Sequence, residues 1–261
     1  MSPVEQSKIG WTTSTWNPVT GCTQISPGCA NCYAKGITER FGGDFSQVIL
    51  HHDRMDQPLH WKKPRRIFVN SMSDLFHKDI PDSFLWAVFH VMAQTPQHIY
   101  QVLTKRPERM QAWVESRLEE NRGSARFWSY IEGKDYRTAW PLENVWLGVS
   151  VENQHFADER IPLLLDTPAA VHWVSYEPAL EAVDFEPFIH WQRGEHVQWL
   201  VCGGESGSNR RPFNVAWAES AYMQCKDAGV PFFMKQDAAF KSEQQGRIPD
   251  WLWNIKEYPQ P

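Results

Sequence analysis

The chain has 261 residues, of which 42% are hydrophobic and 22% are charged, and its formal net charge is −5. The length and composition are typical of a globular protein and fit a single α/β barrel. The negative charge argues against a protein that coats nucleic acid non-specifically, because such binding needs many cations that neutralise phosphates. No apolar run reaches the length of a membrane span, and residues 1–10 lack the apolar core of a signal peptide, so we expect a cytoplasmic protein with no membrane partner.

A weak first strand is expected at residues 15–20, directly before the cysteine loop (residues 21–34), which contains Cys22, Cys29 and Cys32. A proline and a glycine interrupt its longer gap, so a tight loop is predicted. Thiolates that converge from such a loop favour an iron–sulfur cluster or zinc. A closed structural zinc site needs four protein ligands, whereas three cysteines on a cubane cluster leave one iron open. The clustering favours a metal site in a reducing compartment over disulfides.

After the cysteine loop, a helix is expected at residues 33–41, and short apolar runs then alternate with helix-like segments. The runs are residues 67–69, 99–103, 145–149, 171–174, 199–202 and 232–234. They lack alternating polarity and are rich in β-branched or aromatic residues, which is typical of strands buried on both faces of a parallel sheet. Strands that alternate with helices predict right-handed βαβ units. We therefore expect an α/β fold, a partial or full TIM-type parallel barrel, as one domain over residues 1–261.

The segments between the runs carry helix signals. Asp82 and Ser83 can cap one helix, Pro107 suits the first position of another, and Asn214 can cap a third that stops at Gly229. Cys225, within the third, is expected to be a buried apolar residue and not a ligand. Residues 119–143 break the rhythm and are predicted to form an insertion or lid. Most of the fourteen tryptophans lie within apolar runs and are expected in the core.

Polar residues follow every predicted strand, and in parallel barrels the reactive residues lie in these βα loops. The acids are Asp74, Glu152, Glu177 and Glu205, and the other candidates are Lys105, Arg106, Asn153, Gly203, Gly204 and Lys235. The glycines would let a substrate approach the main chain. Strand ends are often polar because they are solvated. The repetition of acids directly after apolar runs nevertheless favours one shared functional pocket.

Two further features leave alternatives open. The basic run at residues 62–66 (KKPRR) is predicted to be a solvated loop, and the alternative is a phosphate contact. The adjacent His51 and His52 are expected at the surface, although either could supply the fourth ligand of a zinc site.

Residues 16–22 (WNPVTGC) and 29–34 (CANCYA) resemble the phage-associated three-cysteine-motif family, a group of largely uncharacterised proteins. The likeness continues through residues 68–76 (FVNSMSDLF), 103–107 (LTKRP), 148–153 (GVSVEN) and 203–212 (GGESGSNRRP), and so covers nearly the whole chain. That family is distantly similar to radical S-adenosylmethionine enzymes, which are partial or full α/β barrels.

The resemblance implies that Cys22, Cys29 and Cys32 hold a [4Fe–4S] cluster whose open iron binds S-adenosylmethionine, and that an electron donor is needed. By the same resemblance, the acceptors for its ammonium group would be Ser71, Ser73 and Asp74, and its ribose would meet Ser150 and Glu152. The sequence departs from the commonest pattern in two ways. Six residues, not three, separate the first two cysteines, and the Gly-Gly-Glu segment follows a later strand than the second.

The leading interpretation is a radical-SAM-like iron–sulfur enzyme that modifies a nucleic acid or nucleotide. Glu177, Glu205 and Lys235 are the candidates for substrate contact or proton transfer. One alternative is a zinc-stabilised nucleic-acid-binding or processing protein, with His51, His52 or Cys202 completing the metal site. Another is a non-catalytic iron–sulfur module of a phage or defence system, for which a phage-encoded partner protein is expected.

Overall fold

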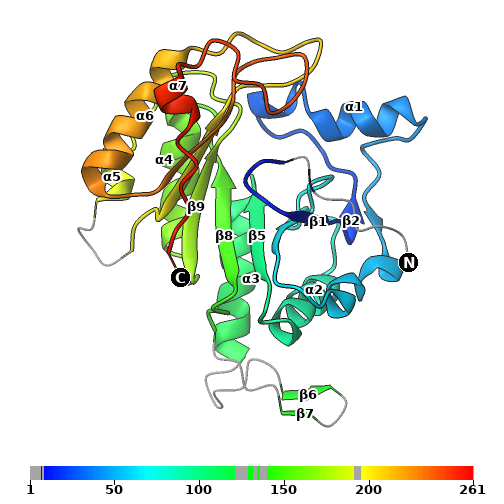
Figure 1. Cartoon of the computed structure of the whole chain (residues 1–261). Coiled ribbons are helices and arrows are strands. Elements are labelled where there is room, and N and C mark those ends of the chain that lie inside the picture. The colour runs from blue at the N-terminus through cyan, green and yellow to red at the C-terminus, as the bar shows by residue number, and fades with distance from the viewer. Residues whose placement is uncertain are drawn as a thin grey trace.

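The computed structural model describes residues 7, 9–120, 129–131, 134–135, 140–190 and 195–260 (Figure 1). Its centre is a seven-stranded sheet in which every pair of neighbours is parallel. In sheet order the strands are β1 (Ser14–Trp16), β4 (Arg66–Val69), β5 (Ile99–Thr104), β8 (Val145–Ser150), β9 (Val171–Tyr176), β10 (Trp199–Gly203) and β11 (Phe232–Gln236). Sheet order follows chain order, and the seven strands form a sheet that is curled into an open half-barrel.

Two short antiparallel pairs and seven helices complete the described fold. The pairs are β2 (Val19–Thr20) with β3 (Ile49–Leu50), and β6 (Ser129–Ile131) with β7 (Lys134–Asp135). The α-helices are α1 (Tyr33–Arg40), α2 (Asp82–Gln94), α3 (Pro107–Glu120), α4 (Gln154–Leu165), α5 (Glu186–Ile189), α6 (Val215–Ala228) and α7 (Asp250–Trp253). The 3₁₀ turns are η1 (Pro27–Cys29), η2 (His52–Arg54) and η3 (Gln57–His60). In Figure 1, α1 lies on the opposite side of the sheet from α4 and α6.

The sheet separates two apolar clusters, because successive side chains of a strand point to opposite faces. The larger cluster joins strand residues such as Leu147 and Leu200 to helix residues such as Val88 and Ile161. The smaller one fills the inner, concave face, and its members are Trp11, Phe68, Trp146, Val171, Trp173, Trp199, Val201 and Phe233. The predicted burial of the tryptophans in the strands is thus confirmed.

Gly148 explains how so many indoles fit inside the half-barrel. It lies beside Trp173 in the β8–β9 register, and a Cβ at this position would overlap the Trp173 indole. The missing side chain therefore makes room for the ring on the next strand.

The six apolar runs are all strands, as predicted, and each strand contains the whole predicted run. Pro107 is the first residue of α3, and Asn214 caps α6 by accepting a hydrogen bond from the Ala216 N–H at 3.1 Å. Gly229 ends α6 in the left-handed conformation, with φ of 71°. Cys225 is fully buried. The α/β class and the parallel partial barrel are therefore confirmed.

Three predicted boundaries need correction. The expected first strand splits into β1 and β2 at residues 17–18, where a proline cannot donate to a ladder. Helix α2 begins at Asp82 itself, since Pro81 occupies the cap position. Helix α1 ends at Arg40, one residue earlier than expected. Of the predicted insertion or lid, most residues lie outside the described residues. Within the described ranges, no helix is long and apolar enough to cross a membrane.

Candidate functional site

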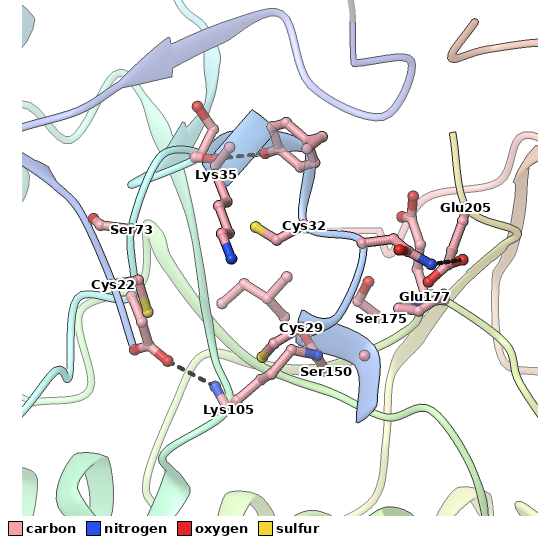
Figure 2. Close-up of a pocket in the computed structure, with 18 of the residues that line it drawn as sticks. Cys22, Cys29, Cys32, Lys35, Ser73, Lys105, Ser150, Ser175, Glu177 and Glu205 are labelled. Atoms are coloured by element: carbon pink, nitrogen blue, oxygen red, sulfur yellow. Dashed lines mark hydrogen bonds between the residues drawn. The ribbon is translucent and has the colours of Figure 1, made fainter. Parts of the chain in front are cut away.

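A cavity of about 780 Å³ lies at the carboxyl ends of the parallel strands, between them and the cysteine loop (Figure 2). Thirteen of the sequence-predicted site residues line it: Cys22, Cys29, Cys32, Ser71, Ser73, Asp74, Lys105, Arg106, Ser150, Glu177, Gly204, Glu205 and Lys235. They meet because the carboxyl ends of neighbouring parallel strands share one edge of the sheet.

The cysteine loop runs from β2 through η1 to α1, and all three of its cysteines are partly buried. In Figure 2 their side chains lie around one space, into which Lys35 also reaches. No three His, Cys, Asp or Glu side chains lie close enough to hold a metal ion, as far as the chain is described. The thiol groups thus face one cavity without converging on a point. Burial raises the pKa of Cys22 to about 11, Asp74 adds to the rise and Arg106 opposes it.

Arg106 anchors the first part of the cysteine loop. Its Nη1 donates to Asp74 Oδ2 at 2.8 Å and to Cys22 Sγ at 3.6 Å, and its Nη2 donates to the Thr23 carbonyl at 2.9 Å. Asp74 in turn accepts hydrogen bonds from the Thr104 hydroxyl and from backbone N–H groups, at 2.7–3.0 Å. The two Asp74 oxygens together accept four hydrogen bonds, which occupies their lone-pair sites. Asp74 therefore orients Arg106 and, through it, Cys22.

Glu152 anchors the middle of the loop. Ser26 Oγ donates to Glu152 Oε1 at 2.8 Å and lies 3.7 Å from Cys29 Sγ. Glu152 is fully buried and forms ion pairs with Lys105 and with Arg160, whose Nη1 lies 3.0 Å from Oε2. A Cβ on residue 28 would overlap the Glu152 carboxylate, so the glycine there lets the loop lie directly on this buried acid.

Glu205 anchors the last part. Asn31 Nδ2, next to Cys32, donates to Glu205 Oε2 at 2.9 Å. Arg211 forms an ion pair with Glu205 and donates to the Pro27 carbonyl at 2.9 Å. Burial by itself would raise the pKa of Glu205, but hydrogen bonds from Arg211 and Asn31 outweigh it and hold the pKa below its usual value. Three strand-end acids thus each support the loop beside a different cysteine.

Glu177 differs from these three acids. It lines the cavity and forms an ion pair with Lys235, which comes from β11. No hydrogen bond joins it to the cysteine loop within the described ranges.

Glu243 also lines the cavity. Its backbone is in the left-handed conformation, with φ of 59°, and the Gly10 N–H donates a hydrogen bond to its side chain at 3.0 Å. Burial raises the pKa of Glu243, with a further contribution from Glu177, while Gly10 and Lys235 oppose the rise.

Five other predicted residues have partners within the fold. Ser71 Oγ donates to Asn17 Oδ1 at 3.2 Å, and Ser73 Oγ donates to the Val19 carbonyl at 3.1 Å. Glu152 lies behind the cavity wall in the ion pairs described above. Asn153 caps α4 by accepting from the Phe156 N–H, and the Gly203 carbonyl accepts from the Ala179 N–H. The two serine hydroxyls can still accept a hydrogen bond from a ligand.

The residues suggested as a fourth zinc ligand lie elsewhere. His51 Nε2 is 2.8 Å from Thr20 Oγ1, the His52 ring packs edge-on against Phe84, and Cys202 is fully buried in the larger apolar cluster. None of them is among the cavity-lining residues.

The basic run at residues 62–66 also lies away from the cavity, at the amino end of β4. The Arg65 guanidinium lies 4.7 Å from the centre of the Trp61 ring, and Arg66 lies 3.9 Å from that of Tyr258. Arg65 also donates to Ser14 Oγ at 2.9 Å. Lys62 and Lys63 are exposed, in line with a solvated loop, whereas the two arginines pack within the fold, which the solvated-loop interpretation did not expect.

Several cavity residues were not among the site residues chosen from the sequence, although two of them lie in the polar segments that follow the predicted strands. Asn70 lies in the segment after β4, with φ of 60°, and Ser175 is the partner of Ser150 in the β8–β9 register. Their signal is the position directly after a predicted strand, and Asn is also among the residues that tolerate a positive φ. For Glu243 we see no such signal, because it follows β11 only after a loop.

Comparison with known proteins places these features in a family. A sequence model of the family described as "Protein of unknown function (DUF5131)" matches residues 6–253. No curated protein and no solved structure matches the chain. Because the family model spans nearly the whole chain, the cysteine loop and the half-barrel included, this protein belongs to the DUF5131 family.

Proposed function

We propose that the protein is a radical-SAM-like enzyme that binds a [4Fe–4S] cluster through Cys22, Cys29 and Cys32. The observation that supports this most is that these three cysteines, from one short loop, line a single cavity at the carboxyl end of a parallel half-barrel. Thiolates suit iron–sulfur clusters, and three of them leave one iron of a cubane free. The resemblance of the cysteine loop and the strand-end motifs to the phage-associated three-cysteine-motif family points the same way.

A cluster of this kind, held by Cys22, Cys29 and Cys32 with S-adenosylmethionine bound, would supply one-electron radical chemistry on a substrate. The chain's own residues would do the rest. Arg106, Ser26 and Asn31 orient the segments beside the three cysteines through their hydrogen bonds to the strand-end acids. Trp11 and Phe68, both nearly buried, close the inner side of the cavity against water.

Glu177 and Lys235 are the best candidates for proton transfer. Their ion pair lines the cavity and is not used to hold the cysteine loop. A carboxylate and an ammonium in contact can accept and donate a proton at adjacent positions of a substrate. Glu205, in contrast, is engaged by Arg211 and Asn31, so we assign it to positioning.

The test begins with protein purified without oxygen. We expect a brown protein with about four iron atoms and four sulfides per chain, whose reduced cluster changes its electron paramagnetic resonance spectrum when S-adenosylmethionine is added. Each of C22S, C29S and C32S should lose the iron. C225A is the matched control, because Cys225 is buried in the core and away from the cavity, and it should keep the iron.

Other outcomes separate the rival functions. A colourless protein with one tightly bound zinc would contradict the proposal and favour a zinc-stabilised protein. A cluster whose spectrum ignores S-adenosylmethionine would favour a non-catalytic iron–sulfur module. An electron donor and a location in the cytoplasm belong to the proposal as its requirements, since reduced clusters need both a reductant and a reducing compartment.

A further inference from the structure

Each cation that lines the cavity has a carboxylate partner. Lys105 pairs with Glu152, Arg106 with Asp74 and Lys235 with Glu177. Lys35, which reaches into the cavity from α1, lies 3.8 Å from Glu39, a residue that also lines the cavity. A phosphate group that entered the cavity would therefore compete with carboxylates in contact with these cations. The basic run at residues 62–66 offers no help, because it lies at the other end of β4.

Uncharged polar groups, in contrast, are available. Asn70 is 2% exposed and lines the cavity, and its Nδ2 donor has no partner among the described residues. Its other side-chain atom, Oδ1, accepts from the Val19 N–H at 3.2 Å, which fixes the orientation of the amide. A buried donor without a partner costs free energy unless a ligand or a water molecule accepts its hydrogen bond.

Ser150 and Ser175 provide a second set of such groups. They are 5% and 2% exposed, line the cavity, and are register partners on β8 and β9. In the described part of the chain, neither hydroxyl forms a hydrogen bond. Adjacent strands are about 4.8 Å apart, so the two hydroxyls can contact neighbouring polar atoms of one small molecule. Figure 2 shows both serines on the wall of the cavity.

An apolar floor lies on the same inner face. Phe68 and Leu103 point to this face one layer below Asn70 and Lys105, and Trp11 packs on Phe68 with ring centres 4.7 Å apart. Aromatic and aliphatic side chains of this kind bury a flat ring system well.

From this arrangement we infer that Asn70, Ser150 and Ser175 recognise an uncharged, planar, hydrogen-bonding group, a nucleoside, within the cavity. Asn70 donates to a carbonyl or ring-nitrogen acceptor, and the two serines serve hydroxyl or amino groups. The inference refines the proposed function by naming its substrate chemistry, and rests on that function for the reaction itself. It favours a nucleoside over a nucleic acid strand, whose phosphates would meet carboxylates.

The test is calorimetric titration of the full-length, anaerobically purified protein with adenosine, AMP and a single-stranded oligonucleotide. We expect adenosine to bind at least tenfold more tightly than AMP, with little dependence on salt. S150A and S175A should each weaken adenosine binding about threefold to tenfold, the loss of one neutral hydrogen bond. S116A, on α3 and away from the cavity, is the matched control and should bind normally.

N70D is the sharpest variant. It keeps an oxygen for the Val19 N–H and tolerates the positive φ, but it replaces the free donor by an acceptor. We expect adenosine binding to fall more than tenfold, and the unfolding temperature is measured alongside because a carboxylate that is buried at this position also lowers stability. If N70D fails to fold, the serine variants still decide the matter.

Competition with S-adenosylmethionine identifies the source of the nucleoside. Simultaneous binding means that these residues receive the substrate and supports the inference, whereas mutual exclusion means that they receive the adenosyl group of that molecule and overturns it. Absence of adenosine binding, tighter binding of the oligonucleotide, or serine variants that bind normally would overturn the inference.

Iron content, measured in the same samples, separates this inference from the proposed function. A colourless protein that binds adenosine through these residues contradicts only the proposed function, and a cluster-bearing protein that does not bind it contradicts only this inference.

Discussion

Ser26 donates a hydrogen bond of 2.8 Å to Glu152, a residue 126 positions later in the chain. The contact joins the cysteine loop to the end of β8 beside Cys29. Because Glu152 is fully buried between Lys105 and Arg160, its carboxylate cannot turn to another partner without leaving two cations unpaired. The loop is thus fixed to a rigid, charged point of the half-barrel.

Replacing Glu152 by glutamine should lower the free energy of unfolding by about 3–5 kcal/mol, the usual effect of removing one partner of a buried ion pair. The amide keeps an oxygen for Ser26 but leaves Lys105 and Arg160 without a counter-charge. Urea denaturation followed by tryptophan fluorescence measures the change. E159Q, on the same α4 and 43% exposed, is the control and should change the free energy by less than about 0.5 kcal/mol. Equal effects of the two variants would refute the assigned role.

Replacing Ser26 by alanine separates the loop contact from the buried ion pairs. The variant removes one hydrogen bond to a carboxylate, so it should cost about 1.5–3 kcal/mol at most and leave Lys105 and Arg160 paired. We expect faster loss of iron to a chelator than in the parent protein, since Ser26 lies next to Cys29. An unchanged rate of iron loss would show that this contact does not position the loop.

Glu205 and Glu177 offer a matched pair of strand-end acids. E205Q removes the negative charge to which Asn31 and Arg211 donate hydrogen bonds, so residue 205 holds the cysteine loop less firmly. We therefore expect proteolysis within the cysteine loop to become faster. E177Q changes an acid that no described hydrogen bond joins to this loop, so its proteolysis rate should match the parent. Limited proteolysis with mass spectrometry locates the cuts. Faster cutting in E177Q alone would reverse the roles assigned to the two acids.

Much of the fold follows from local sequence. Six of the seven strands in the large sheet are apolar runs that local sequence alone reveals, and β1 is the exception. Caps such as Asn214 and stops such as Gly229 act within a few residues, so they are equally readable. The rule that parallel strands present their carboxyl ends at one edge is enough to predict that Asp74, Glu177 and Glu205 meet there.

The roles of the site residues do not follow in this way. Glu152 and Glu177 occupy equivalent positions after neighbouring strands, yet one is buried under the cysteine loop and the other faces the cavity. The difference depends on Gly28, whose missing side chain lets the loop lie on Glu152. It also depends on Arg160, a residue of α4. Such pairings join distant parts of the chain and are set by register and packing, which local patterns do not encode.

Gly148 tests the packing of the inner face. G148A should destabilise the fold by about 1–3 kcal/mol, because its Cβ would overlap the rigid Trp173 indole. G36A is the control: Gly36 lies within α1, nothing lies within 4 Å of its added Cβ, and alanine favours a helix. That variant should be neutral or more stable by up to about 1 kcal/mol. Thermal unfolding distinguishes them, and a harmless G148A would mean that Trp173 is free to move.

Buried histidines predict that stability falls in mild acid. Burial lowers the pKa of His90, His98 and His172 below the ordinary value of 6.5, so the folded protein holds them neutral. Unfolded chains bind protons on these rings as the pH falls through about 6.5, and the folded state does not. The stability contributed by the neutral rings is therefore complete above that pH and is lost below it, by up to about 1.4 kcal/mol per pH unit for each ring.

Histidines dominate the window between pH 6.5 and 5.5, where His51, His77 and His196, whose pKa values burial also lowers, act in the same direction. The depressed pKa values of Glu205 and Asp237 start from 4.5 and 3.8, so their stabilising contributions are lost only at lower pH. The raised pKa of Glu243 acts in the opposite direction, since a folded state that binds more protons gains stability as the pH falls. Urea denaturation at pH 7.5, 6.5 and 5.5 should give a free energy of unfolding that declines more steeply between pH 6.5 and 5.5 than between pH 7.5 and 6.5.

H172Q should make this decline shallower, because it removes one buried ring. Burial lowers the pKa of His172 more than nearby Glu195 raises it. H60Q, at a side chain that is 72% exposed, should leave the slope as it is, and a slope that ignores H172Q would contradict the assignment.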